Sequence, residues 1–436
     1  MAAWSWRWGL SSLLVVAVAL ITRRFLSSPD GPPPNQDIDL PLVDRLVGYF
    51  SEDYFQARSR FISSAEAIGA ELHAYPINST EGLYVDIALL RGDADRVIVH
   101  ISGTHGVEGY AGSAIQLAAM SESQWLRSSS KPTIAFVHAL NAYGFANNRR
   151  NNEDNVDLNR NFLSDNDFES LSARNPNFAG YDDVAFILHP KKSLLTQSLW
   201  LNEVNAWLLT LRAIVLFGVH KIKVALVSGN YAYPEGLGYG GKMSTLSNSI
   251  LREVVQSFAR GRHMVLVDVH TGLGPVGVDS LGLNLHRGRS ITEEDFPVEI
   301  SFGRVTGGIH DSISQPNEKS TFAGYALTRG IISGEFCGQV AGKSTPPRET
   351  LLCVTQEFGT VGNVEVGMAQ VLENNAFVFG DDRLKRWYAG RLRDVFCLPG
   401  RNWRFNVVRR GLRVLEDAAD YLLAAKAAKS DEQPSI

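Results

Sequence analysis

The sequence predicts a single α/β domain with a central, mostly parallel or mixed sheet flanked by helices, and an N-terminal membrane helix in front of it. Three observations support this prediction. Short β-branched and apolar runs alternate with longer segments of helical periodicity, as in α/β domains. These runs contain few polar residues, as expected for strands that are buried on both faces. Finally, Trp8–Thr22 is an uncharged run of 15 residues, and this run predicts the membrane helix.

Composition excludes some classes of function. The chain has 436 residues, of which 44% are hydrophobic and 20% charged, so it can bury a large core. Its formal net charge of −4 lacks the basic excess of nucleic-acid-binding proteins, and we expect no nucleic-acid partner. The three cysteines are few, odd in number and far apart. We therefore expect neither a disulfide framework nor a CxxC metal site.

Residues 1–26 form an apolar N-terminal segment. A helix over Trp8–Thr22 would be about 22 Å long, shorter than the roughly 30 Å core of a bilayer, but its flanking tryptophans and arginines favour insertion. The basic pair Arg23–Arg24 favours an uncleaved single-pass anchor, whereas Ala17–Ala19 is compatible with cleavage of a secretory signal peptide. The segment therefore predicts membrane association, or the secretory pathway if it is cleaved.

A proline-rich linker, residues 27–40, separates this segment from the body of the chain. Arginines on both sides of the apolar run leave its orientation open. Asn78–Thr80 is consequently a glycosylation sequon only if the body faces a lumen.

The body, residues 41–427, is expected to be one domain, followed by a polar tail at 428–436. Its expected elements are two helices within 41–72, strands at 83–90, 95–102 and 132–141, a helix at 108–123, a polar loop at 141–162, a helical insertion at 193–220, strands at 222–229, 264–270, 326–336 and 351–359, and a helical part from about Glu365. Functional groups gather at the carboxyl ends of strands in such sheets. That is where His105, Glu108, Asn141, His270 and Glu357 fall.

His105 and Glu108 are spaced HxxE on a glycine-rich turn between a strand and a helix. A chance histidine and glutamate on such a turn is one explanation. The other is a metal site, because residues i and i+3 on a tight turn can converge on one ion, which zinc binds through imidazole nitrogen and carboxylate oxygen at about 2 Å. The surrounding glycines let the backbone approach metal and substrate closely.

A catalytic zinc site needs a third ligand, and His270 at the end of the run LVDVH is the candidate. Asp268 lies two residues earlier, hence on the same face of the strand, where it can orient the imidazole by a hydrogen bond. The other histidines lack such a pattern, and we expect His100 and His138, which lie inside strands, to be structural.

The loop NNRRNNEDNVDLNRNF is either a solvated loop or an anion-binding pocket. The guanidinium groups of Arg150 and Arg160 suit a carboxylate, and Asp157 can hold the loop. Glu357 ends the apolar run LLCVTQE. A carboxylate there is suited to take a proton from water and deliver it to a leaving amine.

The ordered set of HxxE, DLNRNF, DVH and QEFG resembles the zinc carboxypeptidase superfamily, which includes the aspartoacylase and succinylglutamate desuccinylase branch. The stretches SGTHGVEGYAGSAIQ and VDVHTGLG more closely resemble a domain-of-unknown-function group placed beside those enzymes. The resemblance spans roughly Leu83 to Gly362 and implies one zinc-carboxypeptidase-like domain.

The resemblance also implies roles for individual residues. His105, Glu108 and His270 would bind Zn²⁺, and Glu357 would be the general base and acid. Arg150 would polarise the scissile carbonyl, with Arg149 as the rival in that pair. Asn159 and Arg160 would bind the substrate's free carboxylate. The tyrosine that folds over the substrate in digestive carboxypeptidases has no clear match here: Tyr325, Tyr239 and Tyr233 are candidates.

We therefore expect a zinc hydrolase that cleaves an amide bond next to a free carboxylate, in a peptide or an N-acyl amino acid. A carboxypeptidase and a deacylase of the aspartoacylase type both need this site. A catalytically inactive, membrane-tethered binding protein is the alternative of another class. Such proteins usually lack a ligand or the base, all of which are present here. A serine hydrolase is disfavoured because Ser113 lacks the GxSxG motif.

Overall fold

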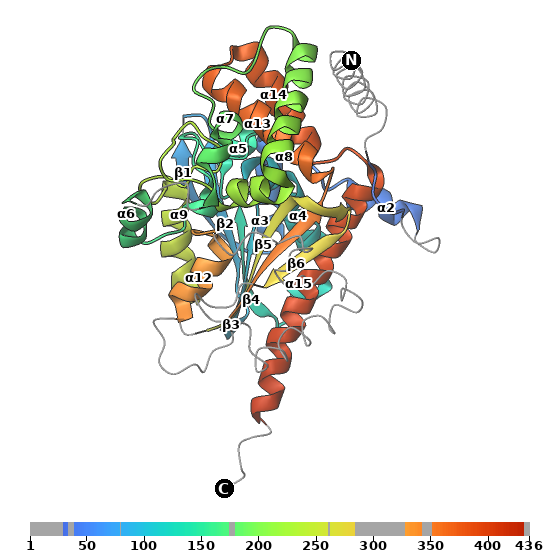
Figure 1. Cartoon of the computed structure of the whole chain (residues 1–436). Coiled ribbons are helices and arrows are strands. Elements are labelled where there is room, and N and C mark those ends of the chain that lie inside the picture. The colour runs from blue at the N-terminus through green and yellow to red at the C-terminus, as the bar shows by residue number, and fades with distance from the viewer. Residues whose placement is uncertain are drawn as a thin grey trace, which may run out of the picture.

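A seven-stranded mixed sheet forms the centre of the described chain in the computed structural model (Figure 1). The structure describes residues 29–33, 39–78, 80–173, 179–259, 262–283, 328–341 and 351–430. The strand order across the sheet is β1-β2-β4-β3-β5-β7-β6. The strands are β1 (Glu71–Asn78), β2 (Leu83–Leu90), β3 (Asp93–Ile101), β4 (Pro132–His138), β5 (His263–Val276), β6 (Asp279–Leu283) and β7 (Leu351–Gly359).

The four central strands β4, β3, β5 and β7 run parallel, while β1, β2 and β6 pair antiparallel with their neighbours. Because parallel strands end at the same edge, the turns after β3 and β4 and the late residues of β5 and β7 meet there. In the β5–β7 register His270 is paired with Glu357. Two of the expected site residues therefore lie on adjacent strands, whose spacing is about 4.8 Å.

Helices cover both faces of the sheet (Figure 1). They are α2 (Leu40–Val47), α3 (Tyr54–Ala67), α4 (Gly109–Glu122), α5 (Ala142–Ala146), α6 (Asp165–Ala173), α7 (Ala185–Leu188), α8 (Leu199–Ser228), α9 (Leu246–Ile250), α10 (Gln256–Ala259), α12 (Ile332–Ala341), α13 (Asn363–Phe379), α14 (Asp382–Phe396) and α15 (Arg401–Ser430). Short 3-10 helices are η1 (Gly106–Glu108), η2 (Gln124–Arg127), η3 (Leu158–Arg160) and η5 (Asp182–Val184), and η6 (Leu251–Val255) is a π-helix.

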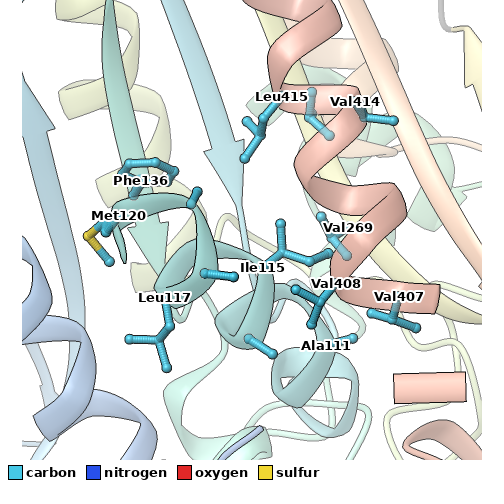
Figure 2. Close-up of a cluster of buried hydrophobic side chains, with 14 of the residues drawn as sticks. Ala111, Ile115, Leu117, Met120, Phe136, Val269, Val407, Val408, Val414 and Leu415 are labelled. Carbon is cyan, nitrogen blue, oxygen red and sulfur yellow. The ribbon is translucent and has the colours of Figure 1, made fainter. Parts of the chain in front are cut away.

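On one face, α2, α3, α4 and α15 bury the larger core. Figure 2 shows how α4 meets α15, with Ile115 directed toward Val408. Gly411 on α15 makes this approach close, because a Cβ there would lie 2.4 Å from Ile115. On the other face, η6 and α12 cover a second core that contains Leu251, Ile332 and Phe336.

The predicted strands at 83–90, 95–102, 132–141, 264–270 and 351–359 are present, with ends that agree to within six residues. The prediction of a strand at 222–229 is wrong, because these residues form the end of α8. The predicted strand at 326–336 is also wrong: residues 328–331 are not in a strand, α12 begins at Ile332, and residues 326–327 lie outside the described residues. Short apolar runs do not distinguish a buried helix from a strand by periodicity. Strands β1 and β6 are not predicted; only the first two residues of β1, 71 and 72, fall in the stretch where two helices are expected.

The expectation for the cysteines is also wrong, since Cys337 and Cys353 form a disulfide bond. Their positions differ by 16 in the sequence, but α12 packs against β7 and brings their Cα atoms to 6.1 Å. Both cysteines are buried, and Cys397 is a buried free thiol. The bond attaches α12 to the strand that carries Glu357.

The predicted membrane helix, Trp8–Thr22, lies outside the described residues. Among the helices that are described, none combines the length and apolar character needed to cross a bilayer. Part of the linker is attached to the body: Asp30 Oδ1 accepts a hydrogen bond from the backbone N–H of Asn402 at 2.9 Å, and the carbonyl of Pro32 accepts one from Asn406 Nδ2 at 2.9 Å.

Candidate metal centre and active site

The turn after β3 carries His105 and Glu108 at the edge of the sheet. It is clamped to the polar loop, because the N–H of Gly106 donates to the carbonyl of Arg150 at 3.2 Å and that of Val107 to Arg149 at 2.8 Å. Glycine is required at position 106, where a Cβ would lie 2.0 Å from the backbone of Gly144. The sequence therefore uses glycine here to let two backbone segments touch.

His105, Glu108 and His270 come together in a buried group whose ligand atoms all lie within 4.8 Å of one another. The Nδ1 atoms of His105 and His270 are 3.2 Å apart. Glu108 Oε1 lies 2.9 Å from Nδ1 of His105, and Oε2 lies 3.1 Å from Nδ1 of His270. Ligand atoms arranged tetrahedrally about 2 Å from an ion stand roughly 3.3 Å apart. The spacing of the three side chains thus fits three of the four positions of a tetrahedral zinc site.

Each histidine has a carboxylate at its outer nitrogen. Nε2 of His105 lies 3.2 Å from Asp157 Oδ1, and Nε2 of His270 lies 2.9 Å from Asp268 Oδ2. Asp268 is itself oriented by the hydroxyl of Thr104, which donates to its Oδ1 at 2.7 Å. Carboxylates in these positions keep the proton on Nε2 and leave the Nδ1 lone pairs facing inward.

This donor set fits a divalent cation. Two inward lone pairs at 3.2 Å repel each other unless a positive charge lies between them. The charges around the centre agree: although burial opposes ionisation, His105 and His270 hold the pKa of Glu108 well below its usual range. Burial likewise opposes charge on His270, but Asp268 and Glu108 raise its pKa well above the usual value. The surroundings stabilise a cation at this point.

Glu357 lies beside the metal centre on β7. Its Oε1 accepts a hydrogen bond from the backbone N–H of Leu273 at 2.8 Å, which fixes the carboxyl group. Burial raises the pKa of Glu357 to about 7, and the nearby Glu108 contributes to this rise. A carboxyl group that is poised near neutral pH can both accept and release a proton.

Arg150 reaches the same centre from the polar loop. Its Nη2 lies 3.1 Å from Asp157 Oδ2, and its Nε donates to Gln370 Oε1 at 3.2 Å. Its Nη1 is buried and makes no hydrogen bond to any part of the chain that the structure describes. A buried guanidinium N–H group without an acceptor costs free energy, and an oxygen atom of a ligand could accept its hydrogen bond.

Arg149 has a different environment. Its Nε donates to Glu373 Oε1 at 2.6 Å, its Nη2 to Asn155 Oδ1 at 2.9 Å, and its guanidinium stacks on Phe377. These contacts hold the polar loop to α13. The geometry favours Arg150 over Arg149 as the group available to a substrate.

Asn159 and Arg160 lie in η3, capped by Asp157, whose Oδ1 accepts from the N–H of Asn159 at 3.0 Å. Asn159 Oδ1 accepts from the N–H of Ile332 at 2.9 Å, and Arg160 Nη1 donates to the carbonyl of Asn159 at 2.7 Å. Both side chains are buried. Asp157 therefore connects His105, Arg150 and η3, a link that the sequence did not reveal.

The candidate tyrosines are placed differently. Tyr325 lies outside the described residues. Tyr233 donates its hydroxyl to Asp182 at 2.9 Å. The carbonyl of Tyr239 accepts from the N–H of Asp157 at 2.7 Å, so its backbone borders the site.

Sequence reasoning missed Gln370 and Glu373, which fix the two arginines from α13. Their spacing of i and i+3 puts them on one helix face, which was the available signal. The expectation for His100 and His138 agrees with their burial in the core. There burial lowers the pKa of His100 to about 4 and that of His138 to about 3.

Comparisons with known proteins give one family and several similar structures. Similar solved structures include the carboxypeptidase A of Helicoverpa armigera (13% identity, TM-score 0.47, 89% of this chain and 81% of that one). A metallo-carboxypeptidase of Burkholderia cenocepacia matches at 12% identity and a TM-score of 0.39, with 83% and 69% covered. A succinylglutamate desuccinylase of Silicibacter matches at 13% and 0.30, with 68% and 61% covered.

No curated protein matches the chain. A family model does: the one described as "Protein of unknown function (DUF2817)" covers residues 50–410. The matched region begins before the sheet and includes all the candidate metal ligands, Glu357 and the arginines. The chain belongs to the DUF2817 family.

Proposed function

We propose that this protein is a zinc-dependent hydrolase that cleaves an amide bond next to a free carboxylate, as a metallocarboxypeptidase does. One observation carries the proposal. Three buried donor atoms of His105, Glu108 and His270 are spaced as in a tetrahedral zinc site, directly beside Glu357. A binding protein without activity would need neither a carboxyl group of raised pKa nor an unpartnered arginine N–H at the same point.

A bound zinc ion supplies Lewis acidity, which acidifies water and polarises a carbonyl group. Glu357 takes up the proton of the attacking water on its carboxylate and passes it to the nitrogen of the leaving amine. Arg150 Nη1 donates to the carbonyl oxygen as negative charge develops there. Asp157 and Gln370 hold the guanidinium in place for this contact.

The free carboxylate of the substrate would be bound by Asn159 and Arg160. Support comes from their position on η3, next to Asp157 and hence close to Arg150 and His105. The same arrangement suits a peptide C-terminus and an N-acyl amino acid, so a deacylase remains the second candidate within this class.

The proposal is tested on the purified full chain by metal analysis and by a mass-spectrometric screen of peptides and N-acyl amino acids. We expect about one zinc per chain and release of an amine in one of the two substrate sets. His105→Ala should lose both zinc and hydrolysis, while His220→Ala, an exposed histidine on α8, should keep both. Full zinc occupancy in the His105 variant would refute the ligand assignment.

We also propose that the chain is membrane-associated through Trp8–Thr22, or enters the secretory pathway if that segment is cleaved. The disulfide bond between Cys337 and Cys353 supports an oxidising compartment for the body. Fractionation of cells that produce the full chain tests the proposal. An intact N-terminus found in the soluble fraction would contradict the anchor.

A further inference from the structure

Helix α8 has an apolar outer face. The backbone of Gly218 is not helical (φ 77°), so 199–217 forms the first straight part of α8. In that part Trp200, Leu201, Leu208, Val215 and Leu216 each expose between 46% and 76% of their surface. Leu201, Leu208 and Val215 are spaced by seven residues, or two turns, and therefore lie on one side. Single exposed apolar residues are ordinary, but five of them between 200 and 216 of one helix are not, even though the exposed Asn205 and Arg212 lie among them.

The inward face of the same helix is partly polar. Asn202 and Glu203 are buried there, and Asn202 Oδ1 accepts a hydrogen bond from the N–H of Thr196 at 2.6 Å. Ala206 packs against Tyr388 and neighbouring residues of α13 and α14. Surface helices of soluble proteins show the opposite arrangement, with apolar residues inward and polar residues outward. The apolar composition of the outer face of α8 is thus typical of a helix face that contacts protein or lipid.

The sequence and the linker suggest what covers it. Only seven residues separate Thr22, the end of the predicted membrane segment, from Asp30, which is bonded to Asn402 of the body. An extended chain spans at most about 3.5 Å per residue, so the body is held within roughly 30 Å of that end. A membrane that holds the N-terminal segment is therefore near the body at all times.

The charges on α8 agree with a lipid surface. The one acidic residue of the helix, Glu203, is buried, while Arg212, between Leu208 and Val215, is exposed; Lys221 lies beyond Gly218 and pairs with Asp183 at 2.7 Å. Basic side chains beside tryptophan and aliphatic residues are typical of helices that lie in the membrane interface. The helix does not meet the length and hydropathy needed to span a bilayer. It can lie on the membrane without crossing it.

We propose that the outer face of α8, formed by Trp200, Leu201, Leu208, Val215 and Leu216, lies in the interface of the bilayer that holds the N-terminal segment. From Trp200 to Leu216 this face is about 24 Å long. The proposal rests on the predicted anchor and is independent of the hydrolase activity. A second copy of the chain, or another segment of it, is the alternative occupant.

The test uses the full chain in vesicles of phosphatidylcholine and phosphatidylserine. Val215→Cys is labelled with an environment-sensitive fluorophore, which is selective because Cys397 is buried and the other cysteines are paired. Phe55→Cys on α3, also an exposed apolar site, is the matched control. We expect the label at 215 to shift to shorter wavelength and to be quenched at least twofold more by spin-labelled lipids than the label at 55.

Three results would overturn the proposal. Equal quenching of both labels by aqueous iodide would show that α8 faces water. A blue-shifted label that lipid spin labels do not quench would show that protein covers the face. Disulfide-linked dimers of Val215→Cys at low protein-to-lipid ratio would assign it to a second copy. Val215→Glu should reduce lipid contact, measured with a label at Leu208→Cys, and leave zinc content and hydrolysis unchanged.

Discussion

Asp157 links three parts of the candidate site through a single carboxylate. It contacts the outer nitrogen of His105, the guanidinium of Arg150 and the N–H of Asn159. Burial opposes its ionisation, but Arg150, Arg160 and His105 hold its pKa well below the usual range. Asp157 therefore stays charged and positions the candidate metal ligand His105 together with the guanidinium of Arg150, which we propose donates to the transition state.

Glu357→Gln should separate binding from chemistry. Glutamine keeps the shape and the acceptor for the N–H of Leu273, so we expect normal zinc content and fold. It cannot carry a proton, and general acid–base groups typically contribute about 10²–10⁴-fold to the rate. Single-turnover kinetics on the zinc-loaded variant measures the loss. A variant with more than half of the wild-type rate would show that Glu357 does not transfer the proton.

Arg160→Ala and Arg150→Ala should differ in kind. A clamp on the substrate carboxylate acts in the ground state, so loss of Arg160 should raise KM more than it lowers kcat. Loss of the Arg150 donor should lower kcat by about 10²–10³-fold. An amidated substrate lacks the carboxylate, and on it Arg160→Ala should be nearly silent while Arg150→Ala keeps its effect. If Arg160→Ala weakens the binding of the amidated and the free-acid substrate equally, Arg160 does not bind the substrate carboxylate.

At the scale of elements, α13 supports the site although none of its residues resembles a catalytic group. Glu373 pairs with Arg149 and Gln370 bonds Arg150. The carbonyls of these two arginines in turn accept from Gly106 and Val107 in the HxxE turn. Through these contacts α13 helps to position the candidate metal ligands.

Glu373→Met should destabilise the protein, because the guanidinium of Arg149 would remain buried without its carboxylate. Removal of one partner of a buried ion pair costs about 3–5 kcal/mol. Denaturant unfolding measures the change in the free energy of unfolding. The double variant Arg149→Met and Glu373→Met leaves no unpaired charge and should be less destabilised than Glu373→Met. If the two are equal, the pair does not hold the loop.

Asp417 makes α15 sensitive to pH. It is buried, and burial raises the pKa of its carboxyl group to about 7, against about 4 in the unfolded chain. The folded protein therefore binds this proton more tightly than the unfolded chain does. The stabilisation that results is fully present below about pH 4 and is lost as the pH rises through 7. Asp417→Asn should therefore raise Tm by a few degrees at pH 8 and have little effect at pH 5. Asp394→Asn, exposed on α14, should show no such difference in a thermal scan.

At the scale of the whole molecule, the N-terminal linker is partly built into the body. Residues 29–33 bond to the start of α15, and Gly31 lies against Gly277 and Trp403. Residues 29–33 are thus part of the folded body, although the proline-rich composition predicted a linker over 27–40.

Two truncations test this boundary. A chain that starts at Pro29 keeps both hydrogen bonds to α15, whereas one that starts at Asp37 loses them. Each hydrogen bond contributes about 1 kcal/mol net, so the free energy of unfolding of the shorter chain should be lower by roughly 2 kcal/mol. Equal unfolding curves in urea would show that the linker is not part of the folded unit.

The sequence alone predicted the α/β class, the central strands and the residues that meet in the candidate site. These follow from local patterns: apolar runs predict buried strands, and HxxE, DVH and QEFG place donors at strand ends, which the parallel register then brings together. Tertiary structure decided the rest. Whether 222–229 is strand or helix depends on what its apolar residues pack against. The disulfide bond depends on α12 meeting β7, and the choice of Arg150 over Arg149 depends on Glu373, 224 residues further along the chain. Contacts between distant segments leave no local pattern in the sequence, so only the folded chain reveals them.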